Sequence, residues 1–132
     1  MPRFVILEHL PGLKGPAAKH WDLLLESAAR LRTWALDAPL TNALSAPISA
    51  TALPDHRLAY LDYEGPLSGE RGSVVQVTSG TYETLEERPG LLRIKLLGAA
   101  RSGSNEPALQ GTAALSAEPG DPQRWRLDWS AD

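Results

Sequence analysis

The sequence predicts a mainly β protein, folded as a small closed antiparallel β-barrel of about eight strands. Short apolar runs alternate with polar residues at the period of two that half-buried strands have. Turn residues, above all the 11 Gly and 11 Pro, separate these runs. No segment has a long apolar period of 3.6 residues, so helices are limited to a turn or two. Closure would remove unpaired strand edges, and a two-sheet sandwich is the alternative.

Three strands are expected near the start of the chain, and the others follow in the remainder. The early strands cover Arg3–Leu7, His20–Leu25 and Arg30–Leu36. Later ones are expected near Ile48–Ala52, as two short strands within 73–83, and over 90–98, 108–116 and 124–129, with a polar turn at 101–107. Short helical turns are expected around Pro16–Lys19, Pro39–Leu44 or Glu83–Glu87. The alternation predicts a barrel interior that includes Trp21, Leu23, Leu25, Leu92, Ile94, Leu96, Trp125, Leu127 and Trp129.

Length and composition predict one ordinary globular domain over residues 1–132. The chain is 42% hydrophobic and 22% charged, enough to build a core without disulfides. It has no cysteine, which excludes thiolate catalysis and fits a cytoplasmic protein. We expect no membrane span and no secretion signal, since no apolar run approaches about 20 residues. A net charge of -3 argues against non-specific coating of nucleic acid.

Two histidines and an aspartate are predicted to converge between the first two strands. His9 ends the first strand, and the loop PGLKGPAAK has enough turn residues to bring His20 back beside it. The period of two places His20 and Asp22 on one face. Two imidazoles and a carboxylate would suit one Mn, Fe or Zn ion at about 2.0 to 2.3 Å. Rings more than about 8 Å apart would exclude a shared ion, and ordinary half-buried residues are the alternative.

The order of motifs resembles a known family. An EH pair ends the first strand, H-aromatic-D lies in a strand ending in LE, and WA, DHxLxYxDYEG, GExG and GTYE follow. In this combination, from Phe4 to about Leu115, the chain resembles the phosphoesterase domain of bacterial DNA ligase D, as a stand-alone member. The resemblance implies a β-barrel hydrolase that trims DNA or RNA 3' ends in DNA repair and end joining, removing a 3'-phosphate or a terminal ribonucleoside.

The resemblance also implies roles for individual residues. His9, His20 and Asp22 match the family's manganese ligands, so one divalent ion is expected, most of all Mn, with Zn or Fe as alternatives. His56 and Tyr60 match the histidine and tyrosine that act with the metal on the phosphate. The expected catalytic residues are therefore His20, His56 and Tyr60.

Position 24 departs from the family pattern. Where the family reads H-Y-D-F-R-L-E, this chain reads HWDLLLE, so Leu24 stands in place of an arginine that contacts phosphate. Leucine offers neither charge nor donor, and Arg57 and Arg32 are the candidates for replacement phosphate binding. If the reaction is retained, Leu24→Arg is expected to raise turnover roughly 30-fold or more.

Two other classes of function remain open. A catalytically weakened member of the same fold would bind nucleic-acid ends or a repair partner such as a ligase or polymerase. An unrelated barrel would hold an apolar ligand, and then the histidines would carry no metal. A stoichiometric metal that is lost on mutating His9 or His20 would exclude the ligand barrel. Hydrolysis is the preferred interpretation because the metal-type residues and the His56 and Tyr60 pair are all retained.

Overall fold

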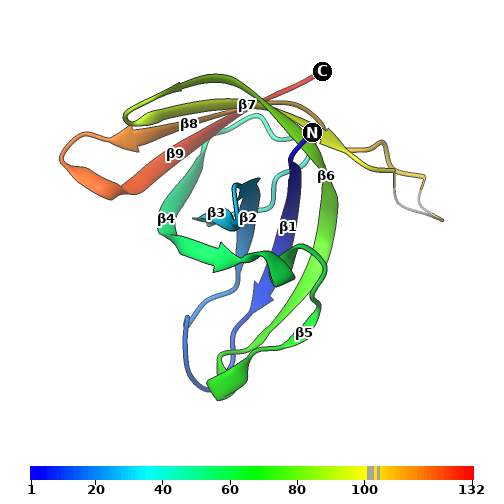
Figure 1. Cartoon of the computed structure of the whole chain (residues 1–132), viewed down its shortest axis with the longest axis vertical. Helices are drawn as coiled ribbons and strands as arrows, with labels where there is room; N and C mark the ends of the chain where they lie inside the picture. The colour runs from blue at the N-terminus through cyan, green and yellow to red at the C-terminus, as the bar shows by residue number, and fades with distance from the viewer. Residues whose placement is uncertain (101–102, 104) are drawn as a thin grey trace.

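The computed structural model describes residues 1–100, 103 and 105–132, which form one antiparallel sheet of nine strands (Figure 1). The strands are β1 (Arg3–Leu10), β2 (His20–Ser27), β3 (Arg30–Leu36), β4 (Ile48–Arg57), β5 (Gly65–Pro66), β6 (Ser73–Arg88), β7 (Leu91–Gly98), β8 (Gln110–Glu118) and β9 (Asp121–Ala131). Two short helical turns, η1 (Leu58–Leu61) and η2 (Ser68–Glu70), flank β5. The predicted mainly β fold is confirmed.

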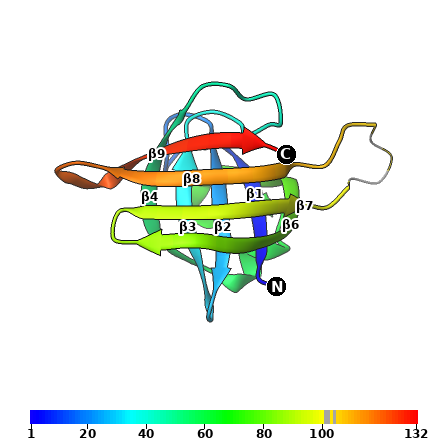
Figure 2. The same ribbon diagram turned by 90° about the horizontal axis from the view of Figure 1, so that it is seen from above.

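Eight of the strands close into a ring. Their order is β1-β2-β3-β4-β9-β8-β7-β6, and β6 returns to pair with β1. The first part of β6 pairs with β1 and the last part with β7. Gly80 lies at this changeover, opposite Phe4 on one side and Gly98 on the other, where a Cβ would overlap the Leu97 carbonyl oxygen. Figure 2 shows β6–β9 running across β1–β4, so the closed sheet has two crossing layers.

The strand positions expected from sequence differ from the structure in a few places. Segment 73–83 is part of one continuous strand rather than two, because Gly80 allows close strand packing instead of making a turn. Glu83–Glu87 also pairs in β6, and the helical turns occur at η1 and η2 instead of at the expected positions. The predicted turn at 101–107 lies partly outside the described residues. Within the described chain, no helix has the length and apolar character to cross a membrane.

The ring encloses the main hydrophobic core, as the alternation predicts. Of the nine expected interior residues, six are buried and the three tryptophans are half-buried against the core. The buried six are Leu23, Leu25, Leu92, Ile94, Leu96 and Leu127. Strand phase was therefore read correctly from the sequence for β2, β7 and β9.

A smaller hydrophobic cluster, here called the outer cluster, lies on the other face of β1–β3. Alternate residues of these strands point away from the ring interior. Residues 58–72, here called the covering segment, lie over these outward-pointing residues. The cluster consists of Val5, Leu7, Leu24, Leu31, Leu61 and Val74, with Tyr60 and Leu67 packed against it. The covering segment thus brings Tyr60 and Leu67 over the strand face that also carries His20 and Asp22.

Candidate metal centre

The structure brings His9, His20 and Asp22 together where β1 ends and β2 begins. His9 and His20 are direct cross-strand partners, with ring centroids 4.5 Å apart, well inside the 8 Å limit. His9 Nδ1 lies 3.1 Å from His20 Nε2 and 3.6 Å from Asp22 Oδ2. His20 Nε2 lies 3.0 Å from Asp22 Oδ1. Each side chain therefore offers one ligand atom to a common point, and these atoms all lie within 4.8 Å of one another.

The backbone of Arg71 fixes the His9 ring. His9 Nε2 lies 3.0 Å from the Arg71 carbonyl oxygen. Because a carbonyl only accepts, Nε2 carries the proton and donates it, which leaves the Nδ1 lone pair directed at His20 and Asp22. Metal-binding histidines usually donate their other ring N–H to a carbonyl or carboxylate in this way. His9 therefore has the Nε2–H tautomer and the backbone hydrogen bond that a metal-binding histidine usually has.

The electrostatics of the trio also fit a cation. Asp22 is 3% exposed, and its Oδ1 has no well-aligned hydrogen-bond donor in the described part of the chain, although His20 Nε2 is close. Burial acts to raise the pKa of Asp22, but the His20 and His9 rings together outweigh it and hold the pKa below its ordinary value. Asp22 in turn raises the pKa of His9, against the effect of burial. An ionised carboxylate with two imidazoles is a donor set that suits Mn, Fe or Zn.

Two glycines allow the backbone around Arg71 to reach His9. Gly72 has a φ of +95°, and a Cβ there would overlap the Leu10 carbonyl oxygen. A Cβ on Gly12 would overlap the backbone of Gly72. The motif GERG signals a turn, but only the fold shows which loop this turn packs against.

Gly72→Ala is expected to weaken Mn binding about 10- to 100-fold, the usual cost of losing a supporting partner of a metal-binding histidine. The added Cβ would push the turn away from β1, so the Arg71 carbonyl would no longer orient His9. Calorimetric titration with Mn measures the affinity. Gly120→Ala is the matched control, since Gly120 has a similar φ of +81° but open space around it. Equal affinity losses in the two variants would contradict this role of Gly72.

His56 and Tyr60 pack together at the end of β4 and in η1. Their ring centroids lie 5.7 Å apart in an edge-to-face arrangement. His56 Nδ1 is 3.0 Å from the Pro54 carbonyl oxygen and 3.2 Å from Thr33 Oγ1, whose own hydroxyl donates to the Leu31 carbonyl. Both neighbours accept, so Nδ1 carries the proton and Nε2 is left for chemistry. Thr33 has no signal in the sequence, because its contact with His56 depends on the pairing of β3 with β4.

Leu24 lies between the metal trio and this pair. It follows Asp22 by two residues on the same face of β2, roughly 7 Å along the strand. It also belongs to the outer cluster against which Tyr60 packs. The trio and Tyr60 therefore lie over the same outer face of the sheet. Leu24 itself is fully buried.

The two predicted phosphate-binding arginines lie in different places. Arg32 shares the inward strand face with Trp34, has its guanidinium 5.3 Å from that ring, and forms a 2.9 Å ion pair with Glu87. The structure therefore does not bring Arg32 to the outer face. Arg57 directly follows His56, lines a pocket with Tyr60, and has no ion pair with any described residue.

Comparison with known families adds to this geometry. Residues 15–116 match the family model of the DNA ligase D 3'-phosphoesterase domain. The chain belongs to this family. No curated protein gives a match. The matched part of this chain contains His20, Asp22, His56 and Tyr60. His9 precedes the matched part, so its place in the candidate centre rests on the geometry.

Proposed function

We propose that this protein is a metal-dependent phosphoesterase that removes a 3'-phosphate or a terminal ribonucleoside from DNA or RNA 3' ends during repair and end joining. The trio of His9, His20 and Asp22, of which His9 and Asp22 are buried and His20 is half-buried, carries the proposal in a member of the DNA ligase D 3'-phosphoesterase family. Nucleic-acid 3' ends are the proposed substrate. A ligase or polymerase that acts on the trimmed end is the proposed partner.

We assign the metal site to His9 Nδ1, His20 Nε2 and the Asp22 carboxylate, with Mn as the first candidate and Zn or Fe as alternatives. A divalent ion bound there would neutralise charge on phosphate oxygens and activate a water. The two histidines are neutral as ligands and Asp22 carries one negative charge. The loaded site would therefore keep a net positive charge, which attracts a phosphate.

His56 is the proposed acid–base group. Because Pro54 and Thr33 hold its Nδ1–H, Nε2 can accept a proton when the ring is neutral and can donate one to the leaving oxygen when it is charged. The Tyr60 hydroxyl has no hydrogen-bond partner among the residues that the structure describes. It is the proposed donor to an oxygen of the same phosphate.

One observation favours the alternative of a member that binds ends without hydrolysing them. The buried Leu24 leaves the outer face without the arginine of the family pattern. The test is end trimming by Mn-loaded protein on primers with a 3'-phosphate or a single 3' ribonucleotide, compared with His20→Ala. Turnover above this control supports hydrolysis. Absence of turnover on DNA, RNA and mixed primers supports binding alone.

Arg57→Gln is expected to raise the KM for a 3'-phosphate primer, because Arg57 is the proposed phosphate contact beside His56. Loss of one such contact should reduce the slope of log affinity against log salt by about 0.7 for a single strand. Fluorescence anisotropy at several salt concentrations measures the slope. Arg124→Gln, an equal charge change at an exposed position on β9, is the control. The same slope in both variants would exclude a specific contact by Arg57.

A further inference from the structure

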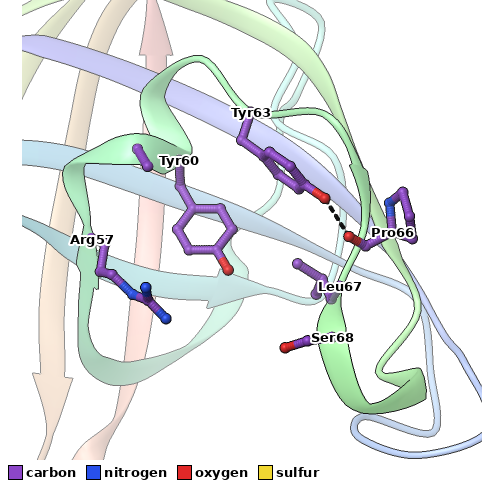
Figure 3. Close-up of a pocket in the computed structure, with 7 residues that line it drawn as sticks. Arg57, Tyr60, Tyr63, Pro66, Leu67 and Ser68 are labelled. Atoms are coloured by element: carbon purple, nitrogen blue, oxygen red, sulfur yellow. Dashed lines mark hydrogen bonds between the residues drawn. The ribbon is translucent and has the colours of Figure 1, made fainter.

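A pocket of about 480 Å³ opens beside the proposed active site (Figure 3). Most of its wall is apolar and comes from the covering segment, with Tyr60, Tyr63, Pro66 and Leu67. Arg57 and Ser68 add polar groups. Pockets of this size and composition are typical of small-molecule sites. Hydrolysis of a phosphate by the trio and His56 does not by itself account for the apolar wall.

Two sets of contacts link the residues of the pocket to the metal trio. Tyr60 and Leu67 pack on the outer cluster, whose member Leu24 follows Asp22 on the same strand face. On the other side, the Arg71 side chain donates from Nε to the Ser68 carbonyl at 2.7 Å, while the Arg71 carbonyl holds His9. The pocket and the trio are therefore supported by the same outer cluster and by the same turn at Arg71.

The aromatic part of the wall is held in place. The Tyr60 and Tyr63 rings pack edge to face, with centroids 5.8 Å apart. The Tyr63 hydroxyl donates to the Pro66 carbonyl oxygen, drawn as a dashed line in Figure 3. Tyr63 is nevertheless 37% exposed. A fixed and partly exposed aromatic ring is a ready surface for stacking a flat ligand.

The polar groups gather on one side of this wall. In Figure 3 the Arg57 guanidinium, the Tyr60 hydroxyl and the Ser68 hydroxyl point toward the same open space. Ser68 Oγ accepts a 3.0 Å hydrogen bond from Arg71 Nη2, which leaves its own proton free to be donated. The pocket thus offers an apolar, aromatic surface beside a set of hydrogen-bond donors. A nucleotide has the matching parts, a flat base joined to a sugar and a phosphate.

We infer that this pocket binds the 3'-terminal nucleoside of the substrate, with the base against the tyrosine wall and the sugar–phosphate at the donors. This inference rests on the proposed function and adds to it a preference for ends that carry a base. Stacking tolerates any base, because each has a π face. We therefore expect recognition of the presence of a base rather than of its identity.

The test compares two single-stranded oligonucleotides that carry a 3'-phosphate and differ only at the last residue, a thymidine or an abasic tetrahydrofuran. Fluorescence anisotropy with the full chain in EDTA is expected to show about 5- to 150-fold tighter binding of the thymidine end. Tyr63→Phe keeps the ring and should retain this preference. Tyr63→Leu keeps apolar volume without a flat ring and should lose most of it. Leu85→Ala, which truncates an exposed side chain on β6, is the control.

Equal affinity of the wild-type protein for the two oligonucleotides would overturn the inference, whatever the variants do. The same proteins are then assayed with Mn for release of phosphate. A base preference in binding without any turnover would support the pocket and contradict the proposed hydrolysis. Turnover without a base preference would support hydrolysis and contradict the pocket.

Discussion

Asp22→Asn is expected to abolish stoichiometric Mn binding and to lower end-trimming turnover by at least about 100-fold. This loss is larger than the one expected when a metal-binding histidine loses only its hydrogen-bond partner. Asp22 supplies the only negative charge among the three ligand groups, and both histidine rings contact it. Asparagine keeps the shape but removes this charge. Elemental analysis after gel filtration measures the bound metal, and primer trimming measures the activity.

Asp62→Asn is the matched control for this variant. Asp62 is exposed and pairs with Arg3 on the surface, so the same chemical change there should leave metal and turnover unchanged. Retention of one Mn per chain by Asp22→Asn would contradict the assignment of the metal ligands. Loss of metal in both variants would indicate a general effect of net charge instead.

Leu24→Arg is expected to destabilise the fold instead of restoring activity, which revises the expectation from sequence. Leu24 is fully buried and packs in the apolar outer cluster. A guanidinium placed there loses its hydration, and the carboxylate of Asp22 on the same strand face is already engaged by His9 and His20, so the cost is several kcal/mol. We expect the free energy of unfolding to fall by at least about 3 kcal/mol, as measured by urea denaturation.

Leu24→Met is the control for that experiment, since a substitution of similar volume should cost less than about 1.5 kcal/mol. If Leu24→Arg were as stable as the wild type and raised turnover, the arginine would have to reach the phosphate past Tyr60. That result would contradict the burial argument and would restore the expectation from sequence.

Most of the fold could be predicted because period-two alternation reports directly on strands. The ring closure depends on pairing between β1 and β6, which are distant in sequence, and local patterns do not encode such pairs. The same limitation explains why β6 was predicted as two strands. Gly80 reads as a break in the sequence, but in the fold it removes a Cβ from a crowded pairing position.

The candidate site was predicted where its members are close in sequence or share a strand face, as His20 and Asp22 do. Arg32 could not be placed relative to the site from the sequence, because both faces of β3 contain apolar residues and alternation does not identify the inward face. Leu24 stands where the family has an arginine, but three consecutive leucines in β2 are typical of a strand buried on both faces. The Arg71 carbonyl could not be predicted at all, because a backbone acceptor has no sequence signature.

The most direct test of the central claim is anomalous diffraction at the manganese edge from a crystal of the protein soaked with Mn. We predict one strong peak per chain, about 2.0 to 2.3 Å from His9 Nδ1, His20 Nε2 and an Asp22 carboxylate oxygen. A peak held by other residues, or no peak at the trio in a crystal that diffracts well, would contradict the proposed metal centre.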